Sequence, residues 1–487
     1  MLGVQAVPDA TYPNLIPRTI AFGSCHSRRS FDRSPPNQPN IWDAIASHRP
    51  DAFLWSGDAV YPPNKLGNAP VTALQYEFNQ LRTNDTLGYS RTMLSGPAAP
   101  PGGIHGTYDD HDYGGNDRGN EMPDRQARRD AYLDFLSIDK SNNTSSNSSR
   151  RSRPGLYSSV SFGTAPRKVL TIFLDTRWGR DRHCIPSIAA SIPFGAVISC
   201  VTRWITAGFN LPAIFASCHT RKMLNEEQWK WLEEEISNSD AQVHVIVSSV
   251  QVLTTNPVVE SWGHFPEERD RLLRLLNKLP GLLLISGDVH HADVLDALAG
   301  IYPQQRQQRI HGIIEVTSSG LTHSCVGPFY GALCAPILRA FATNRFRGVT
   351  LDNRQRGEVG DSSIANHGEY FYTGRNYGTI DIAWAEDEST RNIGTVKVNV
   401  HSDTRHIVLS TGAIYIGKRG TTARNHLKND ELSRVRGCVD GHLRPVSEKM
   451  LLVIVILCFS WIVRRRNDRS SDRSTISVLV PNKEKRA

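Results

Sequence analysis

Short apolar runs alternate with amphipathic stretches along most of the chain. Residues 18–25 form a first run, residues 40–48 show a helical pattern behind an asparagine that can cap it, and residues 51–57 form a second run. A strand, a helix and a strand in such close succession predict a βαβ unit in which the two strands are parallel neighbours.

The pattern returns in the second half of the chain. The run 243–247, a helix from Pro266 to about Leu279 and the run 282–286 predict a second βαβ unit. Further strands are expected at residues 168–174, 313–316, 379–384, 395–400 and 406–409. Further helices are expected at residues 71–81, 123–137 and 225–236, the last one opened by a capping box that starts at Asn225. Two βαβ halves with additional strands predict a layered α/β (α+β) sandwich.

Two of the apolar runs stop at Gly-Asp, in the segments 54–58 and 284–291. A small residue after a buried strand lets the chain turn, and it leaves the next carboxylate at the sheet edge where ligand sites collect. Acidic, imidazole or thiol groups are expected at five such strand ends: Cys25, Asp58, Asp110 with His111, Asp175, and Asp288 with His290. Converging groups of this kind repel one another unless a cation lies between them. The pattern predicts a di- or trinuclear metal site.

Each of these residues taken singly also has an ordinary interpretation. Cys25 fits a small buried residue, and His111 fits a surface histidine held by a carboxylate. Asp175 fits a structural ion pair with Arg177. The metal site therefore depends on the set and not on any one member.

The bulk composition limits the classes of protein. With 487 residues and 39% hydrophobic content, the chain can bury a large core, and residues 1–445 are expected to form one catalytic domain with an insertion at residues 184–218. The net charge of +8 suits an anionic small substrate. No lysine-rich block with interleaved aromatics is found, so nucleic acid is not an expected partner. The Gly-x-Ser-x-Gly elbow of serine hydrolases is also missing.

Eight cysteines are present, and none forms a Cys-x-x-Cys pair, which argues against a zinc ribbon. Cys184, Cys200 and Cys218 share one segment, and Cys325 and Cys334 share another. This grouping is compatible with disulfides in an oxidising compartment, and it leaves their connectivity open.

The apolar stretch 450–463 is followed at once by three arginines. It is shorter than the roughly 20 residues of a typical spanning helix, but its basic flank favours a transmembrane anchor with residues 464–487 as a cytosolic tail. Glycosylation sequons at Asn84, Asn142, Asn143 and Asn147 favour a lumenal or extracellular body. Because residues 1–19 lack signal-peptide features, a tail-anchored protein with a cytosolic body is the alternative.

Five motifs occur in the order and spacing of a known family: residues 22–25 (FGSC), 57–61 (GDAVY), 109–112 (DDHD), 174–177 (LDTR) and 287–290 (GDVH). Through them the chain resembles the PhoD-like alkaline phosphatases, a branch of the calcineurin-like metallophosphoesterases, over residues 18–400. The resemblance implies a four-layer αββα sandwich of two facing mixed sheets, with metals at the carboxyl ends of strands. The Asp-x-His motif that opens the wider superfamily is replaced by Ser24-Cys25-His26, as expected for this branch.

The resemblance also implies cofactors and their ligands. Cys25, Asp58 and Tyr61 match the thiolate, bridging carboxylate and phenolate that hold Fe³⁺ in the family, with Ca²⁺ or another divalent ion beside it. The other ligands that it implies are Asp110, Asp288 and His290. Further candidates for the metal or its surroundings are Asp175, Asn116 and His291. The segment 262–269 resembles the rim of the family's site, which makes His264 a candidate for contact with the substrate.

The implied activity is hydrolysis of phosphomonoesters by a metal-activated hydroxide. His111 matches the histidine that binds phosphate and protonates the leaving group, and Arg177 is the candidate phosphate clamp because a guanidinium can grip two oxygens. One alternative is a phosphodiesterase or lipid head-group hydrolase, which differs in rim loops that the sequence does not resolve. Another is an inactive, membrane-displayed binding protein of the same fold, but the ligand set here is complete.

Overall fold

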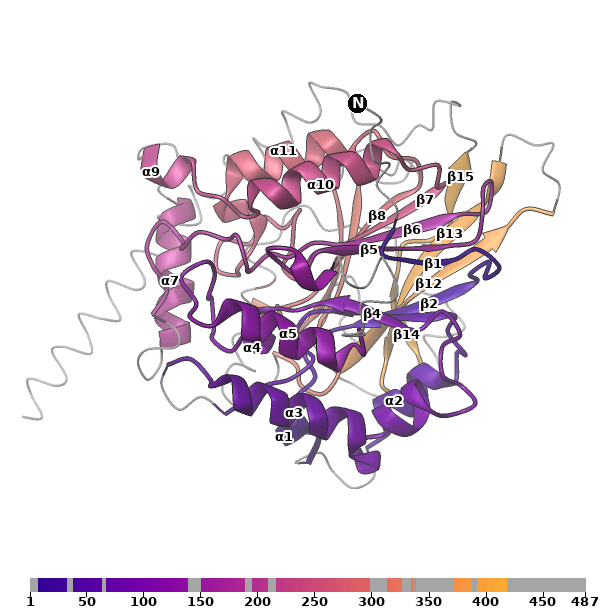
Figure 1. Cartoon of the computed structure of the whole chain (residues 1–487), viewed down its shortest axis with the longest axis horizontal. Helices are drawn as coiled ribbons and strands as arrows, with labels where there is room; N and C mark the ends of the chain where they lie inside the picture. The colour runs from indigo at the N-terminus through magenta and orange to yellow at the C-terminus, as the bar shows by residue number, and fades with distance from the viewer. Residues whose placement is uncertain are drawn as a thin grey trace, which may run out of the picture.

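The computed structural model describes residues 8–32, 38–63, 67–138, 150–188, 195–208, 216–297, 313–325, 334–336, 338, 371–386 and 392–417. Within them, two mixed β-sheets and several helices form a mixed α/β fold, which confirms the expected class (Figure 1).

The larger sheet has the strand order β1-β5-β6-β7-β8-β10-β9-β11. Its strands are β1 (Ala10–Tyr12), β5 (Ser158–Phe162), β6 (Val169–Phe173), β7 (Val243–Val247), β8 (Leu282–Ser286), β9 (Ala292–Asp296), β10 (Ile314–Ser318) and β11 (Phe371–Tyr372). The smaller sheet has the order β14-β13-β12-β2-β3-β4, and β15 also pairs with β13. Its strands are β2 (Thr19–Gly23), β3 (Ala52–Ser56), β4 (Ile104–Thr107), β12 (Asn376–Trp384), β13 (Asn392–Ser402), β14 (Ile407–Ser410) and β15 (Ile414–Gly417).

The described part of the chain also contains several helices. They are α1 (Arg28–Asp32), α2 (Ile41–Ala46), α3 (Val71–Thr83), α4 (Asp110–Tyr113), α5 (Arg125–Phe135), α7 (Gly195–Gly208), α9 (Ala216–His219), α10 (Glu226–Ser237) and α11 (Pro266–Leu276). Short helical turns are η1 (Asp85–Leu87), η2 (Ser90–Leu94) and η3 (Trp262–His264). Helices α10 and α11 cover the larger sheet, and α2, α3 and α5 cover the smaller one (Figure 1).

The alternation of side chains along each strand separates the cores of these layers. In β8, Leu283 and Ile285 point into the core between the two sheets, whereas Leu284 points to the core under α10 and α11. In β2, Ile20 and Phe22 likewise face the other sheet, and Ala21 faces α2. Successive side chains of a strand point to opposite faces, so each strand contributes to two cores.

Parallel pairing aligns the carboxyl ends of the central strands. In the smaller sheet β2 pairs with β3 and β3 with β4, and in the larger sheet β6, β7, β8 and β10 pair in sequence, all of them parallel. Both predicted βαβ units, β2-α2-β3 and β7-α11-β8, are therefore confirmed.

Two glycines allow the strand ends of the sheets to meet. Gly57 has φ of +99°, and a Cβ there would lie 2.6 Å from the Cβ of Asp109. A Cβ on Gly287 would lie 2.4 Å from the backbone oxygen of Ser56, which belongs to the other sheet. Only glycine fits such an approach, so the two Gly-Asp motifs mark the line where the sheets touch.

Helix α10 begins as predicted, with one difference. The side chain of Asn225 accepts a hydrogen bond from the backbone N–H of Gln228 at 3.0 Å, which confirms the cap. The second hydrogen bond of the predicted capping box, from the backbone N–H of Asn225 to the side chain of Gln228, is wrong. The Gln228 amide instead bonds the backbone N–H and C=O of Asp175, at 2.8 and 2.9 Å. The helix is thereby tied to the strand end that follows β6.

Two disulfides resolve the cysteine connectivity that the sequence left open. Cys184 pairs with Cys218, and Cys325 pairs with Cys334, while Cys25 and Cys200 are free. The first disulfide joins the two ends of the segment 184–218, in which α7 lies.

The expected membrane localisation is corrected. Among the described residues, no helix is long and apolar enough to cross a membrane. The longest of them, α7, has 14 residues, whereas a spanning helix needs about 20. The single-pass assignment, in either orientation, is therefore not supported. Residues 450–463 and 464–487, on which it rested, lie outside the described residues, as do the sequons at Asn142, Asn143 and Asn147.

Candidate metal centre

The candidate site lies where the carboxyl ends of β2, β3 and β8 meet. Cys25, Asp58, Asp288 and His290 all adopt positive φ, at 62°, 53°, 70° and 56°. These four are among nine non-glycine residues with positive φ in the described part of the chain. Such backbone conformations cost free energy and gather at functional sites, where the surrounding structure holds them in place.

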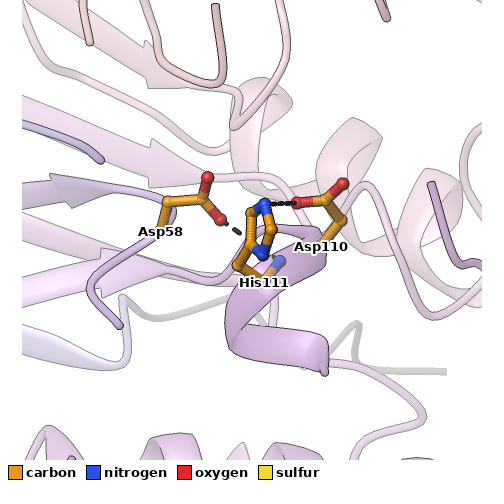
Figure 2. A group of neighbouring side chains, drawn as sticks. All are labelled: Asp58, Asp110 and His111. Atoms are coloured by element: carbon orange, nitrogen blue, oxygen red, sulfur yellow. Dashed lines mark hydrogen bonds and ion pairs between the residues drawn. The ribbon is translucent and has the colours of Figure 1, made fainter. Parts of the chain in front are cut away.

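Four carboxylates converge at these strand ends. Asp58, Asp109, Asp110 and Asp288 each offer an oxygen, and these oxygens all lie within 4.8 Å of one another. Asp58, Asp110 and His111 form an overlapping group with the same spacing (Figure 2). Asp109 Oδ2 and Asp110 Oδ1 are buried and have no hydrogen-bond partner among the described residues. Buried polar atoms are normally paired, so these oxygens are suited to binding a cation.

Cys25 and Tyr61 join the cluster through Asp58. The phenol of Tyr61 donates to Asp58 Oδ2 at 2.6 Å, and the Cys25 sulfur lies 3.7 Å from the same oxygen. The other oxygen, Oδ1, accepts from the backbone N–H of His111 at 3.2 Å. Asp58 thus contacts Cys25, Tyr61 and His111 at once.

The electrostatics of the cluster favour a cation. Burial, and then the negative charges of Asp110, Asp109 and Asp112, raise the pKa of Asp58 well above 3.8. Burial, and then Asp109 and Asp110, raise the pKa of Asp288 well above the same value. Burial also raises the pKa of the Cys25 thiol and the Tyr61 phenol. A bound cation would reverse all of these shifts, so the donor set fits one or more metal ions of high charge.

These shifts predict how the stability of the metal-free protein depends on pH. Burial is the main reason why the pKa of Asp109 is about 7 and that of Asp112 about 8, against 3.8 in an unfolded chain. Above about pH 7, where the histidines of the unfolded chain are neutral, these carboxyls make the folded protein bind more protons than the unfolded one, and its free energy of unfolding falls as pH rises through about 8.

We expect a lower melting temperature at about pH 8.5 than at about pH 7 in chelator, measured by thermal denaturation. Added divalent metal should shrink the difference, because it binds the ionised carboxylates. A metal-free protein that is equally stable or more stable at the higher pH would contradict this assignment.

Three imidazoles surround the Tyr61 ring. The ring centroid of Tyr61 lies 4.1 Å from that of His111, 4.7 Å from that of His323 and 6.2 Å from that of His290. His290 and His323 lie 4.5 Å apart, and the Nδ1 atoms of both are buried without a partner among the described residues. Burial lowers the pKa of His290 to about 4, so its imidazole is neutral and able to bind a metal.

The family model described as PhoD-like phosphatase matches residues 105–369, which is more than half of the chain. The chain belongs to the PhoD-like phosphatase family. A solved structure described as PhoD is similar with 15% identity and a TM-score of 0.47, covering 90% of this chain and 79% of that one. Purple acid phosphatase PPD1 from seeds of yellow lupin (Lupinus luteus) is similar with 9% identity and a TM-score of 0.38, covering 83% of this chain and 54% of that one. A search of curated proteins finds no match.

In this PhoD-like phosphatase, Arg177 lies inside a buried ionic network. Its side chain is fully buried, Nε donates to Asp109 Oδ1 at 2.7 Å, and Nη1 donates to Glu260 Oε1 at 2.8 Å. Arg180 and Arg203 also reach Glu260, at 2.7 and 3.8 Å. Arg177 is thus enclosed by carboxylates and holds Asp109 in the cluster.

A second acidic group of the PhoD-like phosphatase does not suit a metal. Asp117, His183 and Glu260 also have ligand atoms within 4.8 Å of one another. However, the guanidinium of Arg203 pairs with Asp117, and Arg177 and Arg180 pair with Glu260. The arginines already neutralise these carboxylates and would repel a cation, so this group is an ion-pair network.

Four further sequence candidates lie around the cluster in different ways. Both oxygens of Asp175 are occupied, by the backbone N–H groups of 177 and 178 and by the Tyr108 phenol and the N–H of 156. His291 bonds Asp293 and the backbone oxygen of 289, both at 2.8 Å. His264 is buried, bonds the backbone oxygen of 259 and packs against His183. Asn116 is half-buried in the loop after α4.

The structure adds residues that the sequence analysis missed. Asp109 belongs to the carboxylate cluster, and a signal for it was present, since it opens the DDHD motif. Ser319, His323 and Glu260 gave no signal. Ser319 directly follows β10 and the other two lie in loops, and all three reach the site only through long-range packing.

Proposed function

We propose that this PhoD-like phosphatase is a metal-dependent hydrolase of phosphomonoesters. The observation that carries the proposal is the convergence of four carboxylates, one of which, Asp58, also contacts a cysteine and a tyrosine. A thiolate and a phenolate next to a bridging carboxylate suit Fe³⁺, because a trivalent ion stabilises both anions. The proposed iron ligands are Cys25, Asp58 and Tyr61.

A divalent ion such as Ca²⁺ is proposed on the other side of Asp58. Its ligands would be Asp58, Asp110, Asp288 and His290, with Asp109 as an additional oxygen donor that the cluster geometry supports. Hard oxygen donors suit Ca²⁺ and similar ions. When bound, the metals supply an activated water and neutralise phosphate charge.

His111 is proposed as the residue that contacts the substrate. Its side chain is 22% exposed beside Asp110, while its backbone N–H is fixed by Asp58, so the imidazole faces the cluster from its open side (Figure 2). Burial, and then Arg177, leave its pKa below 6.5 even though Asp110 acts in the opposite direction. The free imidazole is therefore neutral and donates a hydrogen bond, and an arriving phosphate dianion favours its protonation for transfer to the leaving alkoxide.

The proposed role of Arg177 differs from the clamp that the sequence analysis expected. Because the guanidinium is fully buried between Asp109 and Glu260, we assign it to positioning Asp109. Asp175 and His291 are assigned to supporting roles, because their polar atoms are already paired.

The test is elemental analysis of the purified full chain together with turnover of p-nitrophenyl phosphate on the same sample. We expect bound iron with a divalent metal, and an activity that chelation abolishes and metal addition restores. Turnover of bis(p-nitrophenyl) phosphate measured in parallel separates a monoesterase from the diesterase alternative. A folded protein that binds no metal and stays inactive after metal addition would instead support the binding-protein alternative.

A further inference from the structure

Ser319 lies at the junction between the two sheets, one residue after β10. It is fully buried and forms an isolated parallel bridge with Ser24, at the end of β2. Leu321 and Thr322 continue this junction, since the N–H of Leu321 donates to the oxygen of Ser24 at 3.1 Å and that of Thr322 to the oxygen of Cys25 at 3.3 Å. The backbone of the larger sheet therefore fixes Ser319 directly against Cys25.

The hydroxyl of Ser319 contacts both halves of the candidate metal centre. Its Oγ accepts a hydrogen bond from the backbone N–H of His290 at 2.9 Å, and it lies 3.0 Å from the sulfur of Cys25. His290 follows β8 of the larger sheet, whereas Cys25 follows β2 of the smaller one. One hydroxyl thus joins two proposed ligands that are far apart in the sequence.

Hydrogen-bond accounting fixes the direction of the contact with sulfur. A serine hydroxyl has one proton and two lone pairs, and a backbone N–H can only donate. The bond from His290 therefore uses a lone pair and leaves the hydroxyl proton free. Within the described part of the chain, the Cys25 sulfur is the only acceptor in hydrogen-bond contact with that proton. A metal-bound thiolate has no proton to give, so in the loaded protein the serine must be the donor.

The other neighbours of the sulfur do not take this role. Asp58 Oδ2 and the backbone oxygen of Asp288 lie 3.7 and 3.8 Å from the sulfur. Neither can donate a hydrogen bond to a thiolate, because the first belongs to an ionised carboxylate and the second to a carbonyl group. The Ser24 hydroxyl is also 3.7 Å away, and it has a second acceptor in the backbone oxygen of Ser318 at 3.3 Å. The Tyr61 phenol also lies within reach of the sulfur, but it donates to Asp58 Oδ2 at 2.6 Å and, as a proposed iron ligand, has no proton in the loaded protein. Ser319 is therefore the nearest group that can donate to the sulfur of the loaded protein.

We propose that Ser319 is a positioning residue that donates a hydrogen bond to the Cys25 thiolate and thereby tunes the bond between this thiolate and iron. A hydrogen bond to a metal-bound sulfur withdraws electron density from it and weakens its donation to the metal. It raises the energy of the sulfur-to-iron charge-transfer transition and the reduction potential of the iron. The same hydroxyl keeps the ligands of the two sheets in register.

This inference rests on the proposed iron site, and the test separates the two. The full-length protein is loaded with Fe³⁺, and its visible charge-transfer band, iron affinity and Fe³⁺/Fe²⁺ potential are measured in the wild type, Ser319→Ala, Ser319→Thr and Ser318→Ala. Ser318→Ala is the matched control, because this buried hydroxyl bonds Asn376 at 2.8 Å and not the sulfur. Ser319→Thr retains the hydroxyl.

In Ser319→Ala we expect a charge-transfer band at longer wavelength and a lower potential, because the thiolate without its hydrogen bond donates more strongly to iron. Ser319→Thr should restore the wild-type band, and Ser318→Ala should not shift it. A Ser319→Ala variant with wild-type band and potential overturns the role of Ser319, although the iron site stands. A wild type whose bound iron shows no iron–sulfur stretching mode in its resonance Raman spectrum, or that binds no iron, overturns the proposed thiolate ligand itself.

A measurement on the wild type covers the case in which Ser319→Ala does not fold. Resonance Raman spectra excited in the charge-transfer band report the iron–sulfur stretching mode. Exchange of the Ser319 hydroxyl in D₂O should shift this mode, because the donated proton is coupled to the sulfur. A mode that is unchanged in D₂O after complete exchange overturns the proposal.

Discussion

Asp58→Asn is expected to lower the turnover of p-nitrophenyl phosphate by at least about 100-fold. Asp58 contacts Tyr61, Cys25 and His111 and lies in both of the groups that suit a metal in the candidate centre. The substitution keeps the shape of the side chain and removes the negative charge that would bridge two ions. We expect loss of bound metal together with loss of activity, measured by elemental analysis and by kcat/KM.

The fold should survive this change. In the absence of metal, Asp58 is repelled by three neighbouring carboxylates, so a neutral amide relieves repulsion, and the melting temperature in chelator should stay level or rise. Asp43→Asn is the control, because Asp43 is half-exposed and pairs only with Arg91 in a surface salt bridge. Near wild-type turnover in Asp58→Asn would refute the site.

His111→Ala should also reduce turnover at least about 100-fold, but with the metal retained.

Glu260→Ala is expected to destabilise the protein by about 3–5 kcal/mol, because it leaves buried guanidinium groups without their partner. Glu260 pairs with Arg177 at 2.8 Å and Arg180 at 2.7 Å, and all three side chains are 0–1% exposed. Burial alone would raise the pKa of Glu260, but the two arginines outweigh it and hold the pKa well below 4.5. The contribution is therefore present at neutral pH and is lost as pH falls.

The measurement is the free energy of unfolding in urea at neutral pH. Glu226→Ala is the matched control, since Glu226 also has two cationic partners, Lys222 at 3.3 Å and Arg271 at 3.2 Å, but is 58% exposed. Surface pairs of this kind contribute at most about 1 kcal/mol. Equal effects of the two substitutions would show that the buried network is not what holds Arg177 and, through it, Asp109.

The sequence predicted the strand ends well. The runs that stop at Cys25, Asp58 and Asp288 become β2, β3 and β8 with bounds close to those expected, because a buried strand of a parallel sheet has an unmistakable apolar run. Parallel pairing then brings the residues after those runs to one edge. This local pattern was enough to predict a metal site.

The surroundings of the site could not be predicted in this way. The guanidinium of Arg177 was expected at the substrate, but its partner Glu260 lies 83 residues further along the chain in an irregular loop. Ser319 reaches Cys25 across 294 residues. The order of the strands also depends on packing between distant segments, which no local periodicity encodes. The membrane assignment rested on composition alone and had no tertiary structure to support it.

The pairing of β12 with β2 determines which pieces of this chain can be produced and studied. The register places Gly378 opposite Phe22, so the smaller sheet needs both ends of the described chain. A fragment cut to residues 105–369, the range of the family match, would lack β2, β3 and β12 and the residues Cys25, Asp58 and Tyr61. A nascent chain that ends before residue 376 would leave β2 as an open sheet edge, a target for aggregation and for cellular quality control. Expression plasmids should therefore encode at least residues 8–417.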